Sequence, residues 1–245
     1  MPSKSALTAA AVQSQTPQQL TLINLPELYD LLYDHVDSTG WWPARSDWQI
    51  IWGAVLVQNT NWKNVDYALA DLAAATAFLP ERIRQLTTAQ LQQTIRSAGF
   101  FVRKAQTIQN LCTYFAQYQD DLGQLRRLPP AQLRRELLAL KGVGEETADT
   151  IMLYGLSQAT FIVDVYARRL FQRLQAPLPK TYQAAQQLLL PQLDPLTLRG
   201  LQAFHACIVL FGQQVKTEQA WQASFLSSYR LTKGECEPTW VASEH

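Results

Sequence analysis

The sequence predicts an all-α fold, and two observations carry that prediction. Apolar residues recur three and four positions apart from Leu25 onward, which is the spacing of an amphipathic helix. No pair of segments shows the alternation of apolar and polar residues that is typical of paired strands. A hydrophobic content of 47% is sufficient for a packed core in a chain of 245 residues, arranged as one large domain or two small ones.

The first predicted helices lie between residues 25 and 74. Residues 1–20 are rich in Ala, Gln, Ser and Thr without an apolar period, so we expect a flexible tail there. The helix from Leu25 ends before Pro43. Asp47 can cap the next helix, residues 48–56, which is nearly all apolar and therefore belongs in the core. A polar turn at 58–61 separates it from a helix over 62–74.

The later helices begin and end at recognisable signals. Thr87 and Gln90 have the spacing of a capping box, and Gly99 ends the helix that they begin. A longer amphipathic helix follows over 102–118. Prolines at 129 and 130 open the next helix, which ends at Gly142. Further helices are predicted over 145–154, 165–174, 182–192 and 199–211.

The most informative stretch runs from Leu140 to Ala148 and is predicted to be a tight hairpin between two helices. Its two glycines flank one apolar residue, and they let the backbone turn sharply and approach a ligand closely. The amides after the second glycine open a helix at its positive end, where a phosphate oxygen binds readily. The hairpin therefore predicts contact with a DNA backbone through Leu140, Lys141, Gly142, Val143, Gly144 and Thr147.

Charge alone is a weak indicator, because the net charge is only +1. Basic pairs nevertheless gather between residues 103 and 173, on both sides of the hairpin. Any single pair is as readily a solvated helix face. Their convergence favours contact with phosphates by Arg134, Lys141 and Arg168.

Several classes of protein are disfavoured. No stretch approaches the ~20 apolar residues that a membrane helix needs, and the N-terminus makes a poor signal peptide, so we expect a cytoplasmic protein, bacterial and acting at the nucleoid. The cysteines, at 112, 207 and 236, fit neither a disulfide framework nor metal-binding spacing, and the three histidines are far apart. We therefore expect no metal site built from these residues.

Two segments together make the family recognisable. The hairpin is followed, at the distance of a helix and a short loop, by Val163-Asp164 and then Arg169. This combination resembles the helix-hairpin-helix DNA glycosylase superfamily of the endonuclease III type, and the resemblance covers most of residues 25–220. The stretches Trp41-Trp42-Pro43, 52–60 and 97–105 resemble the branch that removes 3-methyladenine.

The resemblance implies a two-lobed fold. A six-helix barrel would span residues 47–155 and carry the hairpin at 140–148. Residues 21–46 and 156–230 would form a second helical lobe, and 231–245 a C-terminal tail. Double-stranded DNA containing a damaged base would lie across the hairpin, with the base held between the lobes. The implied activity is that of a base excision repair glycosylase acting on alkylated purines, above all 3-methyladenine, and we expect it to act as a monomer.

Two departures from endonuclease III refine this expectation. Bifunctional members use a lysine in the second hairpin helix as an amine nucleophile, and the matching position here is Glu146, so we expect no lyase step. Many members also end in four cysteines that hold an iron–sulfur cluster, whereas this C-terminal third has only Cys207 and Cys236, so we expect no cluster. The resemblance does imply a possible monovalent cation at the backbone of 140–144.

Asp164 is the candidate catalytic residue, because a carboxylate can stabilise the positive charge that develops on the sugar and can orient water. The alternative is that it only caps the next helix. Flipping a base out leaves a gap in the stack, which Gln58, Asn59 and Asn61 are placed to fill; the alternative there is a capping turn without a DNA role.

The predicted base pocket is formed by Trp41, Trp42 and Pro43. The flat faces of tryptophans attract a cationic purine. Because neighbouring side chains usually point in different directions, we expect one tryptophan in the pocket and one in the core. Two other functions remain open: a glycosylase for uracil, mismatched thymine or oxidised bases, and a non-catalytic DNA-binding module.

Overall fold

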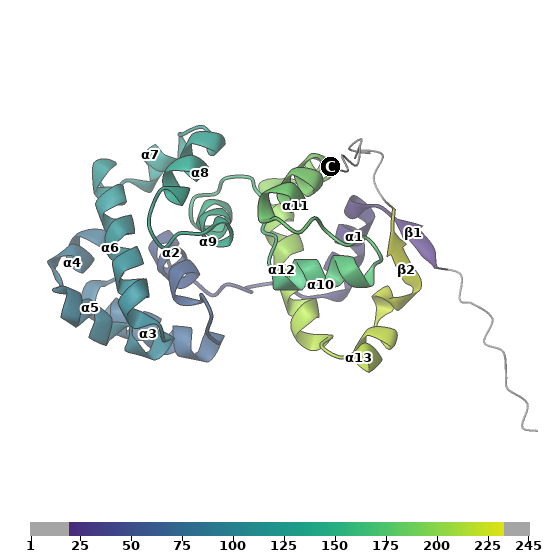
Figure 1. Ribbon diagram of the computed structural model, residues 1–245, viewed down its shortest axis with the longest axis horizontal. Helices are drawn as coiled ribbons and strands as arrows, with labels where there is room; N and C mark the ends of the chain where they lie inside the picture. The colour runs from purple at the N-terminus through teal and green to yellow at the C-terminus, as the bar shows by residue number, and fades with distance from the viewer. Residues whose placement is uncertain (1–19, 233–245) are drawn as a thin grey trace, which may run out of the picture.

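The computed structural model describes residues 20–232. They form two helical lobes that lie side by side (Figure 1). Each lobe has its own cluster of buried apolar side chains, one drawn from residues 51–156 and the other from residues 23–36 and 153–231. The predicted helical fold is confirmed. Residues 1–19 of the expected N-terminal tail and 233–245 of the expected C-terminal tail lie outside the described residues.

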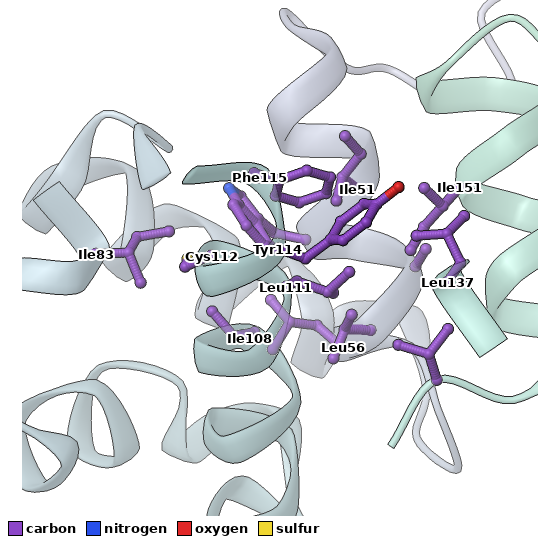
Figure 2. Packing of buried hydrophobic residues seen from close by; sticks show 14 of the residues in the cluster. Ile51, Leu56, Ile83, Ile108, Leu111, Cys112, Tyr114, Phe115, Leu137 and Ile151 are labelled. Carbon is purple, nitrogen blue, oxygen red and sulfur yellow. The ribbon is translucent and has the colours of Figure 1, made fainter. Parts of the chain in front are cut away.

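The first lobe is built around two helices, α2 and α6. In Figure 2, Ile108, Leu111 and Phe115 of α6 pack among side chains of α2 and of the helices beyond it. Leu137 and Ile151, from the helices on either side of the hairpin, pack against this core. The helices of this lobe are α2 (Asp47–Leu56), α3 (Trp62–Thr76), α4 (Pro80–Gln85), α5 (Thr88–Thr94), the 3-10 turn η1 (Arg96–Ala98), α6 (Phe101–Gln117), α7 (Leu122–Arg126), α8 (Pro130–Leu138), α9 (Glu145–Thr150) and its π-helical continuation η2 (Ile151–Gly155).

The second lobe joins the beginning and the end of the described chain. Its longest helix, α12, packs against both α10 and α1, and Leu28, Phe161 and Phe204 are fully buried in its core. The helices of this lobe are α1 (Leu25–His35), α10 (Val165–Arg173), α11 (Tyr182–Leu189), η3 (Leu190–Leu193), α12 (Leu198–Gln214), α13 (Glu218–Gln222) and η4 (Phe225–Ser228).

The second lobe also contains a short parallel strand pair, which the sequence analysis missed. Strand β1 (Thr21–Ile23) pairs with β2 (Tyr229–Leu231), so that Ile23 lies opposite Leu231. Leu231 is buried, so this residue belongs to the second lobe and not to the C-terminal tail that was predicted to begin there. Strands of three residues are too short for an alternating pattern to be visible, and their pairing depends on segments about 200 positions apart.

Helix starts agree with the sequence signals in one case and differ in another. Thr87 and Gln90 form the predicted capping box at α5. Helix α2, however, is capped by Ser46, whose Oγ accepts a hydrogen bond from the Gln49 amide at 3.2 Å. Asp47 instead lies in the first turn and pairs with Arg126. Helices α4, α7 and α13 were not predicted, because five or six residues show no helical period.

A buried polar network connects the lobes and fixes their relative position. Asp149 of α9 is fully buried and accepts two hydrogen bonds from Arg134, at 2.9 and 3.1 Å. Gln186 of α11 donates to the same carboxylate at 2.8 Å and to the Phe161 carbonyl at 2.9 Å. Thr160 donates to the same carboxylate at 3.3 Å. Because the network joins α8 and α9 to the second lobe, it sets the distance between the hairpin and Asp164.

Candidate active site at the lobe boundary

Asp164 lies at the N-terminus of α10, immediately after a buried extended segment. Its backbone is extended, and its Oδ1 accepts a hydrogen bond from the Ala167 amide at 2.8 Å, so the residue is the helix cap. Only 9% of the residue is exposed. Its other oxygen, Oδ2, lies 3.6 Å from Nε2 of His205, which is too long for a hydrogen bond. The capping role is therefore real, and Oδ2 keeps free acceptor capacity.

Residues from both lobes surround this carboxylate. Glu146 belongs to α9 of the first lobe and is exposed at the surface, and partial desolvation of its carboxyl by the surrounding protein raises its pKa. The nearby charge of Asp164 raises this pKa further, whereas His205 lowers it. Tyr154 of η2 is buried, and its pKa is raised well above the ordinary value, mainly by desolvation. Asp164 thus lies at the boundary of the lobes, 3.6 Å from a histidine and within electrostatic reach of a second acid.

An aromatic cluster adjoins the same residues. Trp41 has its ring centroid 5.4 Å from that of Tyr154 and 5.7 Å from that of His205. Trp42 lies 5.4 Å from Tyr154 and 5.3 Å from Trp62, edge-on to the latter. The segment before α2 therefore brings two tryptophans close to the residues that surround Asp164.

The expected division between one pocket tryptophan and one core tryptophan stays a prediction, since both rings are half-buried in one cluster. Trp42 also packs against the first-lobe core, over Gly53 of α2. Pro43 is exposed beside them. The two rings pack edge-on to each other, with centroids 5.5 Å apart, in an irregular segment of the chain.

The two hairpin glycines differ in what they do. Gly142 has φ = +96°, and a Cβ at this position would lie 2.0 Å from Oγ1 of Thr107 on α6, so only glycine fits. Gly144 has an ordinary extended backbone and caps α9, and a Cβ there would meet nothing within 4 Å. The sequence analysis assigned conformational freedom to both glycines, but only the first requires it. Val143 between them is buried in the first-lobe core.

The turn at 58–61 touches the hairpin. Gln58 donates a hydrogen bond to Oγ1 of Thr147 at 2.8 Å and approaches the Gly142 carbonyl at 3.4 Å. Asn61 is exposed and caps α3 by accepting from the Asn64 amide at 3.0 Å, as the alternative interpretation expected. Asn59 is exposed at φ = +51° and caps no helix. These two turns are therefore adjacent, with Asn59 at the exposed tip of the first.

Phe100 lies in the stretch 97–105 that carries part of the family resemblance, but it was not among the predicted site residues. It begins α6 at φ = +47° with 62% of its surface exposed. Lys104 ties this turn to the end of α2, since its ammonium donates to the carbonyls of Leu56 and Ala98 at 2.8 and 2.7 Å. A large apolar residue directly after Gly99 was the available signal, because a turn normally carries a polar residue there.

The two arginines predicted to bind phosphate are both engaged within the protein. Arg134 lies in the bidentate pair with Asp149, and Glu145 is 3.6 Å away, so the prediction of a free phosphate-binding cation is wrong for this residue. It was missed because the buried partner is 15 positions away in the sequence. Arg168 donates to the Pro179 carbonyl at 2.8 Å and stays half-buried. Lys141 is exposed on the hairpin.

Within residues 20–232, no three His, Cys, Asp or Glu side chains are placed to hold a metal ion. Over the same residues, none of the helices combines the length and apolar character required to cross a membrane.

Comparison with known proteins agrees with this geometry. The family model of the HhH-GPD superfamily base excision DNA repair proteins matches residues 52–194. A putative DNA repair glycosylase of Methanocaldococcus jannaschii is 35% identical over 150 residues, which are 60% of this chain and 68% of the relative. An endonuclease III of Sulfolobus acidocaldarius is 29% identical over 132 residues, or 54% of this chain and 57% of that protein.

Solved structures share the fold. A 3-methyladenine DNA glycosylase of H. pylori, bound to 1,N6-ethenoadenine, superposes with a TM-score of 0.65 at 23% identity, covering 78% of this chain and 98% of that one. A trapped endonuclease III–DNA covalent intermediate gives a TM-score of 0.62 at 21% identity, covering 80% and 85%. At these identities the likeness establishes the fold.

Proposed function

The chain belongs to the HhH-GPD superfamily of base excision DNA repair proteins, and from that premise we propose that it is a monofunctional DNA glycosylase for alkylated purines. Its principal substrate is 3-methyladenine in double-stranded DNA, and its product is an intact strand with an abasic site. The observation that carries the proposal is the position of the Asp164 carboxylate at the lobe boundary, with one oxygen on the helix cap and the other without a hydrogen bond.

Asp164 supplies the chemistry in this proposal. Breaking the N-glycosidic bond leaves positive charge on the deoxyribose, and a carboxylate close to that sugar stabilises it. The free acceptor capacity of Oδ2 also suits it to orient or deprotonate the attacking water. Its low exposure strengthens the electrostatic effect, because charges interact more strongly where bulk water is excluded.

The aromatic cluster supports an alkylated purine as the substrate. 3-Methyladenine in DNA carries a positive charge, so its bond to the sugar is already weakened and no strong acid on the base is needed. Electron-rich ring faces attract such a cation by ~2 kcal/mol when water is excluded. Trp41, Trp42 and Tyr154 gather three such rings beside the residues around Asp164.

The hairpin, the turn at 58–61 and the turn before α6 support the proposed contact with DNA. The hairpin offers the start of α9 at Gly144, where no side chain caps the helix amides and a phosphate oxygen is favoured. Asn59 and Phe100 project from the two neighbouring turns. An exposed amide and an exposed apolar ring are suited to fill the gap left by a flipped nucleotide, because one can hydrogen-bond the orphan base and the other can stack.

The absence of a lyase step follows from Glu146. It lies near Asp164 at the position where bifunctional relatives carry their lysine, and a carboxylate cannot form a Schiff base. Lys104 is buried with its ammonium on two backbone carbonyls. Borohydride trapping tests this proposal: we expect no protein–DNA adduct, and a covalent adduct with cleaved strands would contradict it.

A monovalent cation at the hairpin fits the backbone only in part. Two of the relevant peptide oxygens already accept side-chain amides, Lys141 from Asn110 at 2.9 Å and Gly142 from Gln58 at 3.4 Å. The proposed reaction therefore has no step that depends on such an ion.

The decisive experiment combines a lesion panel with one substitution. With enzyme in excess over duplex DNA, we expect release of 3-methyladenine from methylated DNA and little release from duplexes carrying uracil, mismatched thymine or 8-oxoguanine. Asp164→Asn keeps a good helix cap and should slow base release ~10²–10⁴-fold. Asp71→Asn, an exposed acid on α3, is the matched control and should leave the rate unchanged.

The outcomes separate the alternatives. Release of a neutral base without 3-methyladenine would overturn the substrate while leaving Asp164 as the catalytic residue. DNA binding without release of any base would identify a binding module. Normal turnover by Asp164→Asn would remove the assigned mechanism.

A further inference from the structure

His205 is a buried histidine that the proposed mechanism has not used. It lies within α12, with 5% of its surface exposed, and its two ring nitrogens face different partners. Nδ1 lies 2.9 Å from the Tyr154 hydroxyl oxygen, and Nε2 lies 3.6 Å from Oδ2 of Asp164. Nε2 is buried and has no hydrogen-bond partner. An unpartnered buried nitrogen is costly, so one aimed at a carboxylate calls for a functional explanation.

The hydrogen bonds around Tyr154 decide which ring nitrogen carries a proton. The Tyr154 hydroxyl donates its single hydrogen to the Gln202 carbonyl at 3.0 Å. The hydroxyl oxygen can then only accept from His205, so Nδ1 must carry a hydrogen. Burial raises the pKa of Tyr154 and keeps that hydroxyl protonated. The orientation of the His205 ring is therefore fixed by Tyr154, whose hydroxyl is itself held by the Gln202 carbonyl of α12.

With Nδ1 occupied in this way, a second proton on the ring lies on Nε2 and points at Asp164. We propose that His205 is a positioning residue for Asp164: its Nε2 faces Oδ2 at 3.6 Å and restrains that oxygen electrostatically, while the Ala167 amide donates a hydrogen bond to Oδ1. A carboxylate with a hydrogen bond on one oxygen and a facing imidazole N–H near the other turns less readily about its Cβ–Cγ bond, so the lone pairs of Oδ2 keep one direction. This inference rests on the proposed function, because the direction matters only if Asp164 acts on a sugar.

The charged neighbours explain why such a grip is needed. Glu146 lies on the opposite lobe, close enough for its pKa to respond to both Asp164 and His205. Two like charges repel, so a carboxylate with only a helix-cap hydrogen bond would turn away from Glu146. A proton on Nε2 opposes that rotation. Of the elements around His205, α9 contributes Glu146, α10 contributes Asp164 and η2 contributes Tyr154.

The test uses substitutions that remove or retain the donor. His205→Leu fills the site without a donor, His205→Gln places an amide N–H near the position of Nε2, and Tyr154→Phe keeps the aromatic ring but releases Nδ1. Each is measured on methylated duplex DNA with enzyme in excess, for the rate of base release and, separately, for the dissociation constant of DNA. His35→Gln, an exposed histidine on α1, is the matched control.

We expect His205→Leu to slow base release ~10–100-fold with an unchanged dissociation constant, since a small misplacement of a catalytic group has effects of that size. His205→Gln should recover to within ~3-fold of the wild type, and Tyr154→Phe should be intermediate. Tyr154→Phe combined with His205→Leu should be no slower than His205→Leu alone, because both act through one chain of contacts.

A wild-type rate in His205→Leu, or equal losses in His205→Leu and His205→Gln, would overturn the inference. If His205→Leu fails to fold, the rates of base release by His205→Gln and Tyr154→Phe decide. A rate near the wild type for His205→Gln with a slower Tyr154→Phe supports the inference, and equal losses in both contradict it. An inactive wild type would instead contradict the proposed function itself, so the two failures are distinguishable.

Discussion

Two aspartates at the lobe boundary are both buried, yet their surroundings differ in kind. Asp149 is fully buried and receives hydrogen bonds from Arg134, Gln186 and Thr160. Asp164 is 9% exposed and receives one backbone hydrogen bond, while its second oxygen faces a histidine at 3.6 Å. A carboxylate whose lone pairs are all used can only hold the structure together, whereas one with unused capacity is available for chemistry.

The two glycines of the hairpin repeat this contrast on the backbone. Gly142 is enclosed, with Thr107 occupying the space that a side chain would need. Gly144 faces open space. Asp149 and Gly142, which are surrounded by protein, stabilise the site. Asp164 and Gly144, which keep an unused oxygen and open space, are available to a ligand. Substitutions that separate stability from function test this interpretation.

The largest effect on stability is expected for Asp149→Ala. It leaves Arg134 without its main buried partner and should lower the free energy of unfolding by ~3–5 kcal/mol, the range for breaking a buried pair. Asp164→Asn should change the same quantity by less than ~1 kcal/mol, because Asn caps helices well. Urea denaturation measures both. Equal destabilisation by the two substitutions would contradict the division between a structural and an available acid.

Gly142→Ala should follow, with a loss of ~2–4 kcal/mol from the strained backbone and the contact with Thr107. Thr107→Ala in the same chain should restore part of the loss by making room for the added methyl group. Thermal unfolding of the single and double variants gives the values. An unaltered melting temperature for Gly142→Ala would show that the hairpin does not need its left-handed residue.

Lys104→Met tests a buried ammonium group that donates hydrogen bonds to two backbone carbonyls. Two carbonyls lose their donor, and the free energy of unfolding should fall by ~2 kcal/mol near neutral pH. Desolvation lowers the pKa of Lys104 from 10.5 to about 8, so between these values the unfolded chain binds more protons and the wild type gains stability as the pH rises. The difference between wild type and Lys104→Met should therefore grow from pH 8 to pH 10. A constant difference would contradict the lowered pKa.

The smallest effect on stability is expected for Gly144→Ala. A methyl group there meets open space and should change the unfolding free energy by less than ~0.5 kcal/mol. If a phosphate approaches the start of α9, the same methyl group should weaken DNA binding ~10-fold through the loss of a charged hydrogen bond. Fluorescence anisotropy at two salt concentrations measures this, and undiminished affinity would exclude Gly144 from the DNA contact.

Local signals in the sequence were reliable where the structure is local. The capping box at Thr87, the hairpin at 140–148 and the helix that begins after Asp164 all follow from neighbouring residues, and each was predicted close to its observed position. Asp164 itself stood out because it follows the hairpin at a fixed distance along the chain. Contacts across the chain were not predictable in this way, as Arg134 shows: its sequence context indicates a phosphate contact, and its buried partner shows otherwise.

The sequence by itself therefore determined the helical class, the hairpin and the single acid after it, because helix periods, caps and glycine turns depend on residues a few positions apart. Only the tertiary structure decided which groups are consumed by the protein and which remain available. It placed Gln58 on the hairpin, both tryptophans beside Tyr154 and His205 behind Asp164. The physical reason is that a polar group's role is set by the partners around it, and packing brings those partners together from distant segments of the chain.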